Sequence, residues 1–315
     1  MNYISRCFLL LSMFFAFNVL ATGVGTSQVP QGGDIPSFGK PVGEREYWLF
    51  VGNPGAGKST LINALKKRTV AAAGVSPGSG LTKYFTSYED LQNNRVYLDT
   101  PGLADTKMRL EAAQQIEEAL KQNGKYKIFF ILNFNAGRVK AEDLATLNTV
   151  MDAVNLSHKP FSIIINKLED DEKEMLENEN NRAMVFGELN RGNNKTQSVY
   201  YIARSSKLKK KKIEFLDLSD ELYAFFNTRE AIHINKEEIA EVKTDDLEKI
   251  TKVLEGQMQQ MREEFAADKK AQQALIASLQ AAASTMQQQL TEAKNRAEAA
   301  ERNSSSKKDE GCNLL

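Results

Sequence analysis

The stretch Tyr47-Trp48-Leu49-Phe50-Val51-Gly52-Asn53-Pro54-Gly55-Ala56-Gly57-Lys58-Ser59 decides the fold. Its first five residues form a continuous apolar run of strand length. The segment 60–68 that follows places Leu61 and Leu65 on one helical face. Strand, glycine-rich turn and helix are the context that the G-x-x-x-x-G-K-[ST] phosphate loop requires. The stretch therefore predicts an α/β domain that binds a nucleotide.

The phosphate loop gives each of its residues an expected role. Glycines allow successive backbone N–H groups to point at phosphate oxygens, and the N-terminus of the following helix adds the positive end of its dipole. We expect Lys58 to contact the β- and γ-phosphates and the Ser59 hydroxyl to ligate Mg²⁺. The other nucleotide contacts expected here are Gly52, Asn53, Pro54, Gly55, Ala56, Gly57 and Thr60.

A second motif follows the strand-like run 95–98, at Asp99-Thr100-Pro101-Gly102. In P-loop proteins the aspartate after this strand holds Mg²⁺ through water, and D-x-x-G is the GTPase form of the motif. The Gly102 N–H is then expected to contact the γ-phosphate and to release the following loop when that phosphate leaves. The motif favours a GTPase over a P-loop ATPase or kinase.

The phosphate loop and the segment from Asp99 to Asp105 resemble the translation-factor-related GTPases, most closely the GIMAP (immunity-associated nucleotide-binding) and septin-like G domains. The resemblance covers residues 47–206. It implies a three-layer α/β P-loop G domain whose sheet is mainly parallel with one antiparallel strand, and a GTP/GDP cycle with Mg²⁺. It also implies that Lys58, Thr82 and Gly102 act in catalysis, with Thr82 closing over Mg²⁺ in the GTP state. Thr86 is the alternative to Thr82.

Leu103 stands where many small GTPases place a glutamine that orients the attacking water. A leucine cannot polarise water, so we expect slow hydrolysis unless another group enters, often across a dimer. Arg109 and Lys83 are the candidates within this chain. Nucleotide that is bound but barely hydrolysed would instead suit a coiled-coil scaffold.

The guanine-recognition motif is expected after the second of two buried strands, at 127–134 and 161–165, where Asn166-Lys167-Leu168-Glu169 stands. The family pattern is N-K-x-D, and its carboxylate accepts two hydrogen bonds from guanine. Glu169 offers the same acceptor on a longer stem, and Asp170 is the alternative. Ala203 and Arg204 follow a further strand and resemble the S-A-K loop that contacts the base. Loss of guanine recognition at Glu169 would favour an ATPase.

The C-terminal part predicts a long helix. We place the G domain at residues 44–227 and a helical or coiled-coil extension at 228–302. Two heptad series offset by four indicate a coiled coil for self-association or effector binding: Leu247, Leu254, Met261 and Leu275, and Met258, Phe265, Gln272, Leu279 and Met286. Folding back along the G domain is the alternative.

The two chain ends predict opposite locations. Residues 1–21 have the charged start, short apolar run and small-residue exit of a signal peptide, and residues 22–43 form a flexible linker. In the flexible tail 303–315, Cys312-Asn313-Leu314-Leu315 matches a prenylation box, which favours cytosolic membrane association. Cys7 and Cys312 are the two cysteines, so no disulfide framework exists. Lys+Arg and Asp+Glu both number 41, and we expect no nucleic-acid partner.

Overall fold

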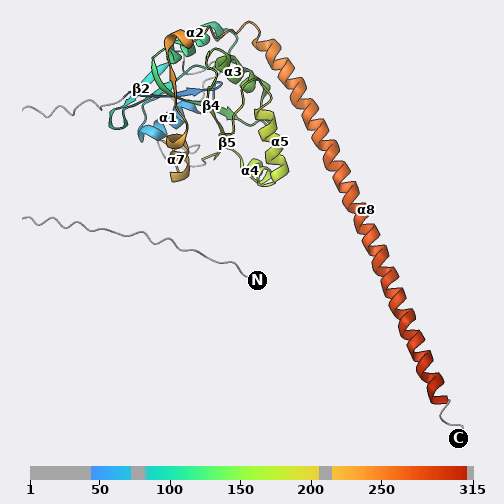
Figure 1. The fold of residues 1–315 in the computed structure, drawn as a ribbon. Coiled ribbons are helices and arrows are strands. Elements are labelled where there is room, and N and C mark those ends of the chain that lie inside the picture. The colour runs from blue at the N-terminus through green and yellow to red at the C-terminus, as the bar shows by residue number, and fades with distance from the viewer. Residues whose placement is uncertain (1–43, 72–81, 83, 206–214, 311–315) are drawn as a thin grey trace, which may run out of the picture. The chain divides into compact units, whose positions relative to one another are not determined.

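The computed structural model describes residues 44–71, 82, 84–205 and 215–310, with side chains to residue 302 (Figure 1). The leader, the linker, Lys83, most of the loop before Thr82, and the prenylation box with Cys312 lie outside the described residues. Among the helices that are described, none is long and apolar enough to cross a membrane.

A seven-stranded sheet is the middle layer of the domain. β1 lies at its centre, parallel to β3 on one side and to β4 on the other. β5 and β6 continue the parallel arrangement, whereas β2 pairs antiparallel with β3 at the edge. The order is β2 (Thr86–Asp90), β3 (Arg95–Asp99), β1 (Glu46–Val51), β4 (Gly124–Asn133), β5 (Ser162–Leu168) and β6 (Val199–Ala203).

Helices cover both faces of this sheet, because alternate side chains of each buried strand point to opposite faces. On β1, Leu49 and Val51 enter one core cluster, and Trp48 and Phe50 enter the other. The first cluster packs under α2 (Arg109–Leu120), α3 (Ala141–Asp152) and α5 (Glu179–Leu189); the second packs under α1 (Lys58–Lys66) and α7 (Asp220–Thr228). The short helix α4 (Asp170–Glu177) follows β5. The expected three-layer α/β fold is confirmed.

The sheet contains a second antiparallel strand that the sequence analysis did not expect. β7 (Ile232–Ile234) pairs with the start of β4. Its two isoleucines are buried while His233 between them is exposed, so even this three-residue strand adds apolar area to the core. The chain then runs through the short 3₁₀ turn η2 (Lys236–Glu238). The sheet thus continues beyond the domain boundary placed at residue 227, and residues 229–246 contain no α-helix.

The long C-terminal helix α8 (Leu247–Glu310) has two different halves. In its first turns Leu247, Leu254 and Met258 are buried in the first core cluster, and the helix lies against α3 and α5. From Ala266 onward its described side chains are exposed. The first half of the predicted extension therefore folds back along the G domain, whereas the second half does not.

Candidate nucleotide site

The phosphate loop connects β1 to α1 and depends on two glycines. Gly52 has a φ of 154°, and a Cβ there would lie 2.2 Å from the carbonyl oxygen of Ile131 on β4. Gly57 caps α1 with a φ of 107°, and a Cβ there would lie 2.3 Å from the Asn166 amide nitrogen. No side chain fits either position without displacing backbone or a second site residue.

Lys58 is buried inside this loop. Its Nζ donates to the Gly52 carbonyl at 2.7 Å and lies 3.5 Å from the carbonyl of Asn53. Burial lowers the pKa of Lys58, and the nearby carboxylates of Asp99 and Asp143 oppose that shift. The ammonium group is thus held where the loop wraps around it, bonded to carbonyls that a phosphate oxygen can replace.

Ser59 and Asp99 meet at the end of β3. The Ser59 hydroxyl donates to Asp99 Oδ2 at 2.6 Å, and Asp99 Oδ1 is buried without a hydrogen-bond partner. Burial raises the pKa of Asp99, and the positive charge of Lys58 counteracts it. A hydroxyl and a carboxylate with a free lone pair are the hard oxygen donors that Mg²⁺ takes, usually together with waters and phosphates. Across the described residues, no cluster of three or more His, Cys, Asp or Glu side chains offers an all-protein metal site.

Gly102 packs directly on the phosphate loop, because a Cβ there would lie 2.5 Å from Cδ of Pro54. Leu103 follows it with its side chain fully buried in the core. Thr82 is half-buried. The alternative, Thr86, begins β2 and lies directly across from Asp99 in the β2–β3 register.

The expected guanine-recognition residues lie together on the other side of the loop. Asn166 is buried and donates to the Ala56 carbonyl at 2.9 Å, while Lys167, with a φ of 63°, donates to the Gly55 carbonyl at 2.5 Å. Both side chains therefore support the phosphate loop. Ala203 at the end of β6 pairs with Leu168.

Glu169 begins α4 and is already engaged. Its carboxylate accepts the N–H of Glu172 in a capping box and forms an ion pair with Arg204. The alternative carboxylate, Asp170, has a fully exposed side chain and pairs with Lys173 at 2.7 Å. Of the two, Glu169 is the one tied to the Ala203-Arg204 loop.

Three polar residues that were not predicted as site residues, Asp143, Thr146 and Asn133, form hydrogen bonds with the phosphate loop. The Asn53 amide donates to Asp143 at 2.7 Å and accepts from the Thr146 hydroxyl at 3.2 Å, both on α3. Asn133, at the end of β4, donates to the Gly55 carbonyl at 3.1 Å. Burial raises the pKa of Asp143 to about 6. The sequence feature that could have indicated these contacts is that Asp143 and Thr146 interrupt an apolar helix face.

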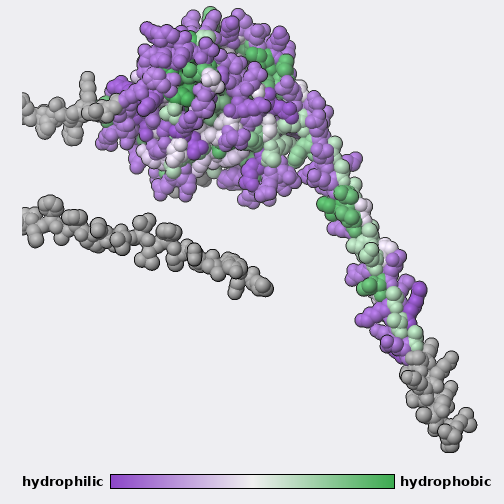
Figure 2. Space-filling model, in the orientation of Figure 1, coloured by the Kyte–Doolittle hydropathy of each residue, from purple (hydrophilic) through white to green (hydrophobic). Residues whose placement is uncertain are grey.

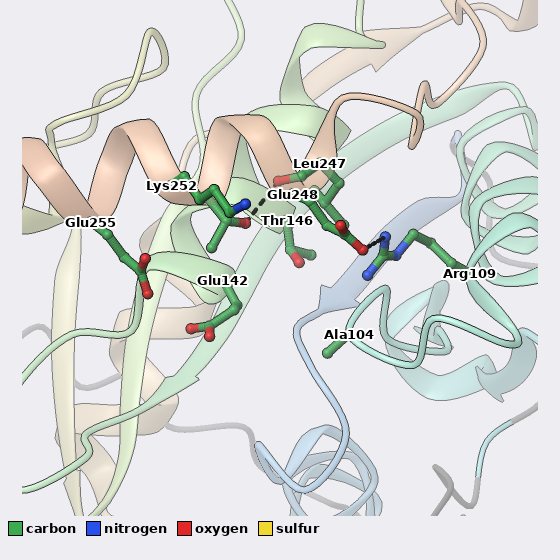
Figure 3. Close-up of a pocket in the computed structure, with 9 residues that line it drawn as sticks. Ala104, Arg109, Glu142, Thr146, Leu247, Glu248, Lys252 and Glu255 are labelled. Carbon is green, nitrogen blue, oxygen red and sulfur yellow. Dashed lines mark hydrogen bonds and ion pairs between the residues drawn. The ribbon is translucent and has the colours of Figure 1, made fainter.

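A contact connects the loop after Gly102 to α8. Arg109 Nε donates to the Leu103 carbonyl at 3.1 Å, and its guanidinium lies 3.4 Å from Glu248 in the first turn of α8. Figure 3 shows Arg109 pointing at Glu248 from across the pocket. The pocket has a volume of about 310 Å³ between the Ala104 loop, α3 and α8. Arg109, one of the candidates for water activation, is held on this side of the domain.

Comparison with known proteins agrees with this geometry. Residues 48–167 match the profile of the family described as 50S ribosome-binding GTPase. Residues 48–167 are thus similar to a P-loop GTPase domain, the class that the fold and the phosphate loop also indicate.

Individual relatives are similar over the same region. GTPase Der of Agathobacter rectalis is 29% identical over 132 residues, which are 42% of this chain and 29% of Der. The probable GTP-binding protein EngB of Mycoplasmopsis pulmonis is 33% identical over 108 residues, 33% of this chain and 56% of EngB. The chain thus spans less than two thirds of the length of either relative. The finer resemblance to GIMAP and septin-like domains stays a prediction.

Among solved structures, Toc33 from Arabidopsis thaliana in complex with GDP and Mg²⁺ aligns with a TM-score of 0.41 and 17% sequence identity. The alignment covers 61% of this chain and 88% of that chain. The TM-score and the sequence identity are both too low to bear on function.

Proposed function

We propose that this chain binds GTP with Mg²⁺, hydrolyses it to GDP and phosphate, and works as a conformational switch. The observation that carries the proposal is the meeting of Lys58, Ser59 and Asp99 beside the phosphate loop, with one Asp99 oxygen buried and unpartnered. An unpaired buried oxygen is costly unless a ligand completes its coordination. A water of a bound cation is such a ligand.

Within this proposal each residue has a defined task. Lys58 exchanges its carbonyl partners for β- and γ-phosphate oxygens. Ser59 and, through water, Asp99 hold Mg²⁺, with Thr82 completing the site in the GTP state. The cation neutralises negative charge on the phosphates. Gly102 donates its N–H to the γ-phosphate from its place against Pro54.

Slow turnover is the expected kinetic consequence. The Leu103 side chain is buried in the core, so it offers nothing to the attacking water. Arg109 is held by the Leu103 carbonyl and Glu248. A dimer partner or an activator would have to supply the missing group. If none does, the runner-up function is a scaffold that binds nucleotide and barely hydrolyses it.

The signal from the nucleotide has a direct route to the C-terminal helix. Loss of the γ-phosphate would move Gly102 and with it the next residue, Leu103. The Leu103 carbonyl accepts a hydrogen bond from Arg109, which also contacts Glu248 on α8. The extension would thus respond to nucleotide state and serve for self-association or effector binding. Membrane attachment through the leader or Cys312 belongs to the same proposal but rests on sequence alone.

The preference for guanine over adenine separates this proposal from a P-loop ATPase. The Glu169–Arg204 ion pair favours the ATPase alternative, because it occupies the carboxylate that would otherwise bind guanine. The test is a titration of the full chain with GTP, GDP and ATP in Mg²⁺, followed by phosphate release at several protein concentrations. Lys58→Ala is the loss-of-binding variant, and a melting curve checks that it folds. We expect GTP preference, loss of binding in Lys58→Ala, and turnover that rises with protein concentration. Equal or tighter ATP binding would make the GTPase proposal wrong.

A further inference from the structure

The second half of α8 exposes large apolar side chains that have no contact with the folded domain. Leu275, Ile276, Leu279, Met286 and Leu290 are 54% to 72% exposed. Figure 2 shows hydrophobic clusters along this part of the helix, beyond the domain. Apolar surface gathered in this way marks an interaction site.

Four of these side chains, all except Leu275, belong to one seam in which the spacing alternates between three and four residues. The seam keeps Leu279 and Met286 of the series expected from the sequence but has Ile276 in place of Leu275. Leu254 and Met258 of that series are buried against the domain. Its positions a and d repeat every seven residues without a charged or amide side chain, the pattern of a left-handed coiled coil. The seam consists of Ile276, Ala283, Leu290 and Ala297 at position a, and Leu279, Met286, Ala293 and Ala300 at position d.

We infer that residues 276–300 of α8 bind the same segment of a second copy of this chain as a parallel, in-register coiled coil. The inference deepens the self-association named under the proposed function but does not depend on GTP binding. It therefore fails or holds independently of the nucleotide site.

Charge pattern selects the parallel arrangement. Arg296 precedes position a and Glu301 follows position d, and in a parallel dimer such g and e residues five apart pair between the helices. Arg296, whose exposed ion pair with Glu292 in its own helix is weak and exchangeable, thus meets Glu301 of the other copy. In an antiparallel dimer centred on residue 288, g residues face g residues and e residues face e residues, so Arg296 lies beside Ala282 and Glu301 beside Gln273. Only the parallel register brings opposite charges together along this seam.

The folded domain sets where the seam begins. Arg262 Nε lies 2.5 Å from Glu188 Oε1 on α5, so this residue is used within its own chain. Lys269 then stands at position a and would face its own copy across a parallel dimer, which is destabilising. Pairing therefore starts at Ile276, on the order of 16 Å along the helix from Phe265. A parallel dimer holds both GTPase domains at the same end of the coiled coil.

The experiment uses the full chain with Cys7→Ser and Cys312→Ser, which leaves no native thiol. Ala297→Cys puts a thiol at position a, and Ala299→Cys, on the outer face, is the matched control. Under mild oxidation we expect Ala297→Cys to form a covalent dimer and Ala299→Cys to stay monomeric on a non-reducing gel. A mixture of Leu279→Cys and Ala297→Cys proteins tests the antiparallel arrangement, since those two positions face each other only there. A disulfide between the two variants in that mixture would overturn the inference.

Light scattering gives a second measurement. The parent is expected at twice the chain mass in the absence of nucleotide. Leu279→Lys with Met286→Lys places like charges in the seam, and the molar mass is expected to fall to half. Thr285→Lys on the outer face is expected to keep the dimer mass, and GTP binding in both variants should match the parent. A parent that is monomeric throughout a concentration series would refute the parallel dimer.

Discussion

Glu169 at the start of α4 and Arg204 after β6 form an ion pair that joins the two loops expected to contact the nucleotide base. The Arg204 N–H also donates to the Leu168 carbonyl at 2.8 Å, so the two loops are connected through backbone as well. In the N-K-x-D pattern the fourth residue presents its carboxylate to guanine. Here that carboxylate has a protein cation and a helix N–H as partners, with which a guanine base would have to compete.

Glu169→Asp should therefore bind GTP more tightly and increase the preference for GTP over ATP. The shorter stem weakens the reach to Arg204 and matches the family pattern. Hydrogen bonds to a charged group are each worth roughly 1.5–3 kcal/mol, so we expect about a tenfold gain or more in GTP affinity. Titration calorimetry with GTP and ATP measures both affinities. Asp170→Asn is the control, since its exposed carboxylate contacts Lys173, and it should change neither. An equal gain for ATP would contradict guanine recognition at this position.

The grouping of residues at the candidate site could be expected from sequence because its signals are local. A strand, a glycine turn and a helix are consecutive, and the D-x-x-G motif ends the next parallel strand, so Lys58, Ser59 and Asp99 reach the same edge of the sheet. The support behind the loop had no such signal. Asn53 is 90 residues from Asp143 along the chain, and only tertiary packing brings α3 to it.

The C-terminal half was harder to predict for two physical reasons. β7 has three residues, too few for a detectable alternation, and it is stabilised by pairing with β4. The first half of α8 has the same heptad spacing whether it packs on its own domain or on another helix. Leu254 and Met258 satisfy either arrangement, and only the structure shows that they lie against the domain. The exposed seam keeps Leu279 and Met286 of the predicted series but has Ile276 in place of Leu275.

Asp143 should make the stability of the domain depend on pH. Burial raises its pKa to about 6 from an ordinary 3.8, so the folded state binds this proton more tightly than the unfolded state. The resulting stability is complete below the unfolded pKa and is lost as the pH rises through about 6, by about 3 kcal/mol in total. Asp143→Asn removes this titration while keeping an acceptor for the Asn53 amide. Its free energy of unfolding should therefore rise relative to the parent between pH 5 and pH 7.5, as measured by urea denaturation.

The control for that experiment is Glu111→Gln, an exposed carboxylate on α2. Its difference from the parent should stay constant over the same pH interval. Parallel pH curves for Asp143→Asn and the parent would show that Asp143 has no raised pKa in solution.

Arg262 and Glu188 should be the strongest anchor of α8. The Glu188 side chain is 1% exposed and its second oxygen has no partner among the described residues. Arg262→Met leaves this carboxylate buried and unpaired, which costs about 3–5 kcal/mol. Adding Glu188→Gln should recover part of the loss, because the charge is gone. Urea unfolding measures both variants. Arg296→Met, further along the same helix at 82% exposure, should change stability by less than about 1 kcal/mol; an equal loss there would contradict the anchor.

Arg109 should transmit the nucleotide state to α8, because it contacts the Leu103 carbonyl and Glu248 together. In the parent, amide hydrogen exchange in the first turns of α8 should differ between GDP and a non-hydrolysable GTP analogue. Arg109→Ala removes both contacts and should abolish this difference. Glu248 is 72% exposed, so the ion pair itself contributes only about 0–1 kcal/mol and global stability should barely change.

A charge swap separates the two contacts of Arg109. Arg109→Glu with Glu248→Arg restores an ion pair with α8, but a carboxylate cannot donate to the Leu103 carbonyl. The swapped protein should therefore protect the first turns of α8 about as well as the parent and still show no difference between nucleotides. If the swap restores the nucleotide response, the ion pair alone carries the signal. If Arg109→Ala keeps the full difference seen in the parent, the coupling runs through other residues, for which the Asn53 contacts with α3 are the available route.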